Sequence, residues 1–195
     1  MCFTVVVLIL VRHGRTAANA AGVLQGRLDI PIDDVGLEQV RQVAAAIGPV
    51  DRVISSPLMR ARETAAQFGQ PVTVDDRWIE LDYGEYDGLP LSAVPAAAWQ
   101  QWSTDTTFST PGGESMGSLD TRVRAACADA FATASDERVV VVSHVTPIKA
   151  AVAWALGCDI SISFRCHLDQ ASVCRIISGP RGAVLRSFNE VLYAR

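Results

Sequence analysis

The chain has 195 residues, enough for one domain with a full hydrophobic core, and 49% of them are hydrophobic. The net charge of −4 and the pI near 5.3 argue against nucleic acid or an anionic membrane as a partner. No apolar stretch approaches the roughly 20 residues that span a bilayer, and the apolar N-terminus lacks the basic flank of a signal peptide. An odd number of cysteines without C-x-x-C spacing is typical of reduced thiols, so we expect a cytoplasmic protein.

Strand and helix patterns alternate along the first part of the chain. In chain order we expect a strand at 5–11, a helix at 36–47, a strand at 52–55, a helix at 57–68 and a strand at 71–74. The first strand is a run of seven apolar residues, which is typical of a strand buried on both faces of a parallel sheet. We expect Ser56 to cap the second helix, with Pro57 in its first turn.

A segment rich in turns and aromatic residues follows at about 83–113. Irregular stretches of this length in a compact domain are usually functional or contain a short helix, which we place at 95–102. The segment is therefore predicted to be a lid. Its aromatic side chains either form the core of that lid or contact a ring-bearing substrate, and the first interpretation is slightly preferred.

The last part of the chain continues the alternation. We expect a helix capped by Ser115 and ending near residue 133, a strand at 138–143, a helix at 146–156, and a hairpin of strands at 171–177 and 183–188. This succession predicts an α/β fold of three layers, α/β/α, with a mostly parallel sheet flanked by helices. We assign residues 1–195 to one domain.

Arg12, His13 and Gly14 come directly after the first predicted strand. In an open α/β sheet, ligands bind beyond the carboxyl ends of the strands. Arg12 offers a planar fork of donors that suits phosphate oxygens, and His13 can be a nucleophile at neutral pH. Gly14 would let the backbone approach a ligand closely. An isolated tripeptide of this kind is more often a surface loop, so its interpretation depends on the rest of the chain.

Further patterns accompany this tripeptide along nearly the whole chain. The five segments, in order, are Arg12 to Thr16 with Asn19; Gln25 and Gly26 with Asp29, Pro31, Gly36 and Gln39; Ser55 to Ala65; Glu80 with Gly84, Asp87 and Gly88; and Val139 to His144. Together they resemble the signatures of the histidine phosphatase superfamily, also called the phosphoglycerate mutase-like family. Each segment alone is weak, but five in the family's order are strong evidence. The resemblance implies a phosphoglycerate mutase-like fold.

The resemblance also implies a reaction and a set of site residues. His13 would attack phosphorus and carry the phosphoryl group as a phosphohistidine. The residues that would surround the phosphoryl group are Arg12, Arg60, His144, Asn19 and Thr16. His144 counts with His13 and Glu80 as catalytic. The chain's three scattered histidines give no credible metal site, and no cofactor is expected.

Glu80 matches the family's acid position and would protonate the departing alkoxide, then accept a proton from the attacking water. Its neighbours Asp82, Glu85 and Asp87 compete for this role, and Glu80 is preferred because of its place in the motif.

Three other residues are candidates for substrate binding: Gln25, Val145 and Thr146. Gln25 is equally compatible with a turn. Val145 would narrow the space beside the phosphate, and Thr146 would cap the following helix and offer a hydroxyl. The sequence His-Val-Thr-Pro-Ile-Lys replaces the small glycines common after the second histidine, and it resembles α-ribazole-phosphatase-like and acid-phosphatase-like members.

The preferred hypothesis is a phosphatase whose partner is a small phosphomonoester substrate; the sequence leaves its identity and the oligomeric state open. The alternative is a primer-dependent phosphoglycerate mutase. Mutases are usually longer and commonly have glutamate where this chain has Arg15, which favours the phosphatase branch. A second alternative is a catalytically inactive protein that binds phosphorylated ligands. It is disfavoured because no catalytic position is substituted.

Overall fold

The structure is a computed structural model that describes residues 7–134 and 136–194. The strands are β1 (Val7–Arg12), β2 (Arg52–Ser55), β3 (Val72–Val74), β4 (Arg138–Ser143), β5 (Val173–Gly179) and β6 (Gly182–Glu190). The α-helices are α1 (Ala17–Ala20), α2 (Asp34–Ile47), α3 (Met59–Ala65), α4 (Ala96–Thr104), α5 (Met116–Thr133) and α6 (Val145–Leu156). Short 3₁₀ turns cover 66–68, 76–78, 84–86, 91–93 and 160–165.

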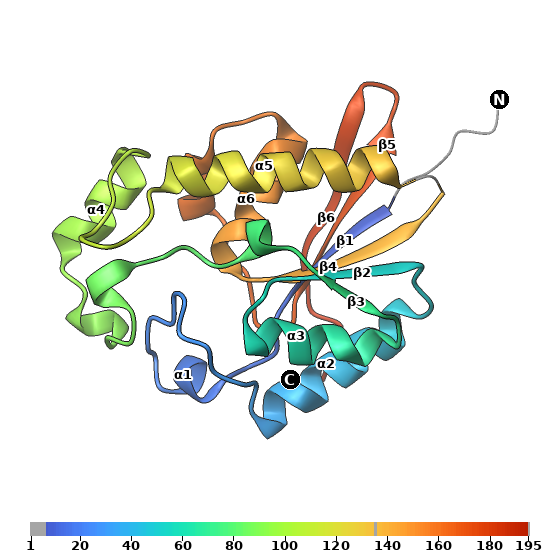
Figure 1. Ribbon diagram of the computed structural model, residues 1–195, viewed down its shortest axis with the longest axis horizontal. Coiled ribbons are helices and arrows are strands. Elements are labelled where there is room, and N and C mark those ends of the chain that lie inside the picture. Colours follow the sequence, from blue (N-terminus) through green and yellow to red (C-terminus); the bar gives the residue numbers. More distant parts are fainter. Residues whose placement is uncertain (1–6, 135, 195) are drawn as a thin grey trace.

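The six strands form one mixed sheet in the order β3-β2-β4-β1-β5-β6 (Figure 1). The four strands from β3 to β1 run parallel, whereas β5 and β6 are an antiparallel hairpin added at the β1 edge. Helices α2 and α3 lie on one face of the sheet, and α5 and α6 lie on the other (Figure 1). The predicted three-layer α/β/α fold is therefore confirmed.

The central strands β1 and β4 are buried on both faces, as their uninterrupted apolar runs predict. Leu8 and Leu10 of β1 pack with α5 and α6, whereas Ile9 and Val11 pack with α2 and α3. Successive side chains of a strand point to opposite faces, so each layer of helices receives every second residue. The predicted residues Val5 and Val6 of the first strand lie outside the described residues.

Several helix starts differ from the expectation because a capping side chain was overlooked or wrongly assigned. Helix α2 begins two residues early, because the Asp33 carboxylate accepts a hydrogen bond from the backbone N–H of Gly36. The prediction that Ser56 caps the second helix was wrong. Helix α3 begins at Met59, and its N-cap residue is Leu58, which has an extended backbone and no side-chain cap. Helix α1 was missed, although Thr16 and Asn19 form a capping box around it.

The segment at 83–113 contains the predicted helix, which is α4, and two 3₁₀ turns. It lies beyond the sheet, beside the loop that holds α1 (Figure 1). Trp102 is buried at its centre, with rings of Tyr83, Tyr86, Trp99 and Phe108 packed around it at centroid distances of 5.3 to 6.0 Å. The segment thus has an aromatic core of its own. Its action as a lid stays a prediction.

The predicted cap Ser115 is confirmed, since its hydroxyl accepts from the backbone N–H of Ser118. Within the described ranges, no helix has both the length and the apolar character needed to cross a membrane.

Candidate active site

The two candidate histidines follow neighbouring strands of the sheet. Arg12 pairs with Ser143 in the register of β1 and β4, so His13 and His144 leave the sheet side by side. Their ring centroids are 5.2 Å apart, and both side chains are buried. The carboxyl ends of parallel strands meet at one edge of a sheet, and this edge is where the predicted site lies.

His13 is held in one tautomer by its own loop. Its Nδ1 lies 2.7 Å from the carbonyl oxygen of Gly14, which can only accept, so Nδ1 carries the proton. The other nitrogen, Nε2, therefore keeps its lone pair. Burial lowers the pKa of His13 well below its ordinary value, and the cations of Arg60 and Arg12 lower it further. The ring is thus neutral and available as a nucleophile at neutral pH.

Arg60 is the second residue of α3, and its side chain is almost completely buried. Its Nε donates to His144 Nδ1 at 3.2 Å, and its two terminal nitrogens donate to the carbonyls of Leu28 and Gly26 at 2.6 and 2.7 Å. A guanidinium has five N–H donors, so two remain for a ligand. The loop at 26–28 therefore fixes the orientation of the fork.

Arg12 is the second buried guanidinium at this edge of the sheet. It donates one terminal N–H to the carbonyl of Leu168 at 2.6 Å, and its buried Nε has no partner among the described residues. Burial lowers the pKa of Arg12 to about 10, while the carboxylate of Glu80 counteracts this effect. A buried cation with an unused donor is a costly arrangement that a bound anion would relieve.

His144 is oriented by Ser56, a contact that the sequence did not predict. Because Arg60 Nε can only donate, His144 Nδ1 accepts, and Nε2 carries the proton. That proton is donated to Ser56 Oγ at 2.7 Å. Both side chains are fully buried. Burial lowers the pKa of His144 well below its ordinary value, and Arg60 adds to this.

Glu80 lies in the same buried cluster. Its Oε1 accepts hydrogen bonds from the backbone N–H groups of Leu81 at 2.8 Å and Thr146 at 3.3 Å. Oε2 has no partner among the described residues and stays available. The charge of the Glu80 carboxylate also raises the pKa of both Arg12 and Arg60, against the larger effect of their burial, so this carboxylate lies within electrostatic reach of the two guanidiniums.

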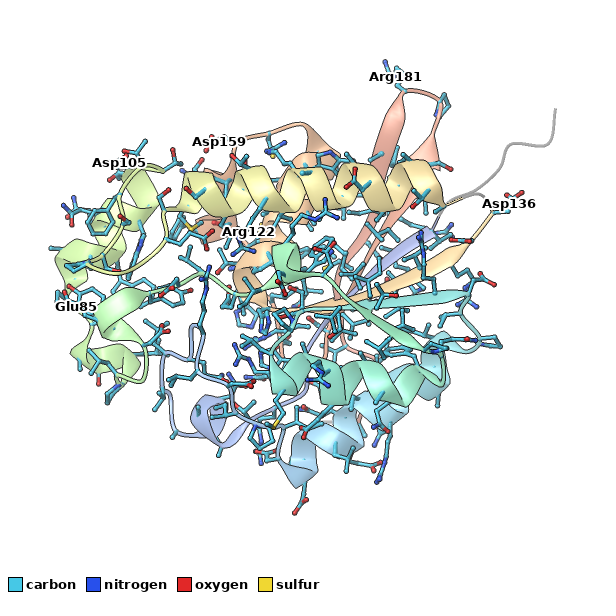
Figure 2. The ribbon with its side chains drawn as sticks, in the orientation of Figure 1. Glu85, Asp105, Arg122, Asp136, Asp159 and Arg181 are labelled. Atoms are coloured by element: carbon cyan, nitrogen blue, oxygen red, sulfur yellow. The ribbon has the colours of Figure 1, made fainter. Side chains whose placement is uncertain are left out.

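The three competing acids occupy other environments. Glu85 is exposed on the segment beside α4, far from the sheet (Figure 2). Asp82 pairs with Arg27 at 3.3 Å and accepts from the backbone N–H of Gly84. Asp87 accepts from the backbone N–H of Arg27, and partial burial raises its pKa. Two of these carboxylates thus hold the loop that carries Arg27, and the third faces solvent.

A partly buried ion network fixes the backbone at Glu80, and sequence analysis missed it. The Arg122 side chain extends from α5 into the middle of the molecule (Figure 2). Its terminal nitrogens donate to the carbonyls of Arg77, Ile79 and Glu80 at 2.7 to 3.3 Å. The carboxylate of Glu114 accepts from Arg122. Nothing in the pattern of a mid-helix arginine indicates this role.

The expected phosphate ligands Thr16 and Asn19 form a cluster with Gln25. The hydroxyl of Thr16 lies 3.1 Å from Asn19 Oδ1 and 3.0 Å from Gln25 Oε1, so its single proton serves one of them at a time. Thr16 and Gln25 are buried. The three side chains thus support one another in the loop after His13, and their contact with a phosphate stays a prediction.

Gly14 approaches helix α2 closely, and its expected approach to a ligand stays a prediction. A Cβ at Gly14 would lie 2.6 Å from the carbonyl oxygen of Gly36 in α2, and a Cβ at Gly36 would lie 2.1 Å from that of Arg15. The backbone N–H of Gly14 donates to Thr64, whose hydroxyl donates to the carbonyl of Arg60. These contacts join the loop of His13 to both α2 and α3.

Val145 and Thr146 both belong to the first turn of α6, which begins one residue earlier than expected. The helix begins at Val145 with His144 as its N-cap, so the prediction that Thr146 caps it was wrong. The Thr146 hydroxyl lies 3.3 Å from the hydroxyl of Tyr83. Both residues, with Val145, line a cavity of about 240 Å³ whose aromatic wall includes Trp99 and Trp102. The aromatic residues therefore both fill the core of the 83–113 segment and face a cavity.

The chain is similar to known proteins over most of its length. The family model described as "Histidine phosphatase superfamily (branch 1)" matches residues 8–191. A bifunctional protein of Mycobacterium tuberculosis is 35% identical over 176 residues, which cover 85% of this chain but 48% of that protein. The chain thus spans about half the length of this relative. Phosphoserine phosphatase 1 of Hydrogenobacter thermophilus is 31% identical over 194 residues, or 93% of this chain and 91% of that protein.

Solved structures show the same likeness. A phosphoserine phosphatase from Entamoeba histolytica, in complex with phosphoserine, has a TM-score of 0.88 at 26% identity and covers 95% of this chain and 98% of its own. A mycobacterial glucosyl-3-phosphoglycerate phosphatase, in complex with VO3, has a TM-score of 0.83 at 30% identity and covers 94% and 98%. With the family model matched over nearly the whole chain, the protein belongs to the histidine phosphatase superfamily.

Proposed function

We propose that this chain hydrolyses small phosphomonoesters through a phosphohistidine formed on His13. One observation carries the proposal: the unprotonated Nε2 of His13 lies in a buried cluster with two guanidiniums that keep unused donors and with the carboxylate of Glu80. Phosphoryl transfer needs little more than an aligned nucleophile, positive charge on the oxygens and a proton for the leaving group.

In the first step, His13 Nε2 forms a bond to phosphorus and the bond to the ester oxygen breaks. The non-bridging oxygens accept hydrogen bonds from the free N–H groups of Arg12 and Arg60, and His144 lies beside them. Glu80, protonated at that moment, gives its proton to the departing alkoxide through Oε2.

In the second step, a water molecule attacks the phosphohistidine. Glu80, now ionised, takes one proton from this water, and the bond between phosphorus and His13 breaks. The histidine regains its lone pair and inorganic phosphate leaves. The hydrogen bonds to Glu80 Oε1 hold the carboxyl group in place for both proton transfers. Thr16 and Asn19 would complete the binding of the phosphate.

The names of several relatives support a metabolite phosphatase, among them the phosphoserine phosphatase above and a glucosyl-3-phosphoglycerate phosphatase of Mycolicibacterium vanbaalenii, 35% identical over 171 residues. That match covers 78% of this chain and 75% of the relative. A probable phosphoglycerate mutase of Salmonella newport is also similar, at 33% identity over 178 residues, so the mutase activity is the competing candidate. An assay of 3-phosphoglycerate isomerisation, with and without a bisphosphoglycerate primer, separates the two activities. We expect release of inorganic phosphate and no dependence on the primer.

The decisive experiment compares wild type with His13→Ala, using His167→Ala as the control because the His167 side chain is exposed. With para-nitrophenyl phosphate, His13→Ala should lose turnover by several orders of magnitude, while the control keeps it. Acid quenching of the wild-type reaction with labelled substrate should trap a phosphoenzyme that is labile in acid. Substantial turnover by folded His13→Ala would refute the proposal, as would the absence of turnover in the wild type.

The cytoplasmic location is part of this proposal. Within the described residues four cysteines are free: Cys127, Cys158, Cys166 and Cys174. Free thiols support a reducing compartment. The cysteine at position 2 lies outside the described residues.

A further inference from the structure

The cavity beside the phosphate site is not used by the proposed mechanism. It lies between the aromatic segment at 83–113 and the first turns of α6, and it has a volume of about 240 Å³. Thr146 connects the cavity to the site. It lines the cavity, and its backbone N–H donates to Glu80 Oε1. The cavity therefore opens next to the group that would protonate the leaving alcohol.

Lys149 lines this cavity and is the only lysine of the chain. Its Nζ donates to the carbonyl of Ser163 at 2.9 Å, and it makes no ion pair with any carboxylate of the described residues. Two of its three N–H donors thus have no partner in the part of the chain that the structure describes. Burial lowers the pKa of Lys149, whereas the nearby Cys166 and Glu80 raise it and Arg12 lowers it further. A partly buried cation without a counter-ion is destabilising unless a ligand supplies one.

Two more lining residues have polar atoms without partners. Ser163 Oγ and Trp102 Nε1 are both buried and have no hydrogen-bond partner among the described residues. Both residues are more than nine-tenths buried, at 4% and 2% exposure. An indole N–H and an ammonium can only donate, and a hydroxyl can do so as well. The unused groups therefore suit a ligand group that only accepts hydrogen bonds.

We propose that Lys149, Ser163 and Trp102 bind a carboxylate on the alcohol part of the substrate, so that the chain prefers phosphomonoesters of apolar or ring-bearing hydroxy acids. The inference rests on the proposed phosphatase function. One ammonium balances the single charge of a carboxylate, whereas the phosphoryl site has two guanidiniums. Tyr83 and Trp99 supply an apolar wall for the part of the substrate that joins the two charged groups.

The spacing along α6 agrees with such a substrate. Lys149 lies four residues after Val145, which places it about 6 Å further along the helix. Side chains of a helix lean towards its N-terminus, and in α6 this is the end that follows His144. Phosphate and carboxylate would then be separated by a few bonds or by one ring, which suits a small metabolite.

The test uses two pairs of esters that differ only in the carboxylate. The aryl pair is para-carboxymethylphenyl phosphate and para-tolyl phosphate, and the aliphatic pair is O-phosphoserine and O-phosphoethanolamine. Wild type should prefer the carboxylate in at least one pair, with kcat/KM higher by about 10- to 100-fold, the range expected for a hydrogen bond to a charged group. Lys149→Met should remove this preference and leave kcat/KM for the uncarboxylated ester within about twofold.

Arg165→Met is the matched control, because it removes an exposed cation from the same 3₁₀ turn that carries Ser163. It should keep the preference, and Ser163→Ala should reduce it. The proposal is overturned if wild type shows no preference in either pair, or if the preference survives in Lys149→Met. Calorimetric binding of the carboxylated aryl ester to His13→Ala, with and without Lys149→Met, separates the two proposals. If the two variants bind the carboxylated aryl ester with equal affinity, the carboxylate site is refuted. If wild type hydrolyses none of the four esters, the phosphatase function is refuted.

Discussion

Replacing Ser56 by alanine tests whether the orientation of the second histidine matters for turnover. Ser56 Oγ accepts the only N–H of the neutral His144 ring, at 2.7 Å. Alanine cannot accept this proton, and both side chains are fully buried, so water cannot replace the hydroxyl without a rearrangement. The ring would then be held by the bond from Arg60 alone, and its Nε2 N–H would be left without an acceptor.

The size of the effect follows from this burial. Leaving a buried donor unpaired costs about 1–3 kcal/mol. If this whole free-energy penalty opposes the orientation of the His144 ring that turnover requires, kcat/KM falls by about 5- to 100-fold. About 1.4 kcal/mol corresponds to a factor of ten. The free energy of unfolding should fall by a similar amount. Stability alone therefore does not separate a positioning role from a packing role.

The matched control is Ser55→Ala. Ser55 is equally buried, and its hydroxyl donates to the carbonyl of Ser56 at 2.8 Å without touching His144. Both variants should lose stability in urea unfolding. Steady-state assays should show that only Ser56→Ala loses kcat/KM and competitive inhibition by phosphate, and that Ser56→Thr restores both. Equal kinetic losses in the two alanine variants would refute the argument that Ser56 acts through His144.

Three further outcomes follow from the site. Arg60→Ala should raise the inhibition constant of phosphate more than about 10-fold, and Arg60→Lys should not restore it, because one ammonium cannot replace a planar fork; an unchanged constant would exclude Arg60 from the phosphate site. The depressed pKa values of His13 and His144 mean that the unfolded chain binds protons below about pH 6.5 that the folded chain refuses. The contribution of these histidines to stability is therefore fully present above that pH. As the pH drops, the free energy of unfolding falls by up to about 1.4 kcal/mol per pH unit for each histidine. In urea unfolding of His13→Ala, the free energy of unfolding should depend on pH with a slope smaller by the amount for one histidine. Gly36→Ala should destabilise the fold by about 1–3 kcal/mol or more, because its Cβ would meet the Arg15 carbonyl at 2.1 Å; a melting temperature equal to that of wild type would contradict this.

The layers of the fold were predictable because the strands carry their own signal. Seven uninterrupted apolar residues can only be buried on both faces, and β1 and β4 do occupy the centre of the sheet. Helix starts were less predictable, because they depend on which of several polar residues turns its side chain to the backbone. Asp33 does so at α2. The hydroxyl of Ser56 instead accepts a hydrogen bond from His144, and α3 has no side-chain cap.

The residues that would contact the phosphoryl group were predictable for a different reason. His13 and His144 follow apolar strands, so their position at the edge of the sheet follows from the strand pattern alone. The groups that orient them could not be found in this way. Arg122 reaches the backbone at Glu80 from the middle of α5, at a distance of more than 40 positions along the chain. Such contacts depend on how the helices pack, which local sequence patterns do not predict.

The burial of the site explains why its supporting residues matter as much as the reacting ones. In a water-excluded cluster, the charges of Arg12, Arg60 and Glu80 act on one another with little screening, so each has to be held against the others. The carbonyls of Gly26 and Leu28 serve this purpose for Arg60. They accept hydrogen bonds from its terminal nitrogens, and these bonds offset part of the repulsion between Arg60 and Arg12. The same low dielectric keeps both histidines neutral. A nucleophile with a free lone pair beside two fixed cations is thus a consequence of the packing and not of any residue alone.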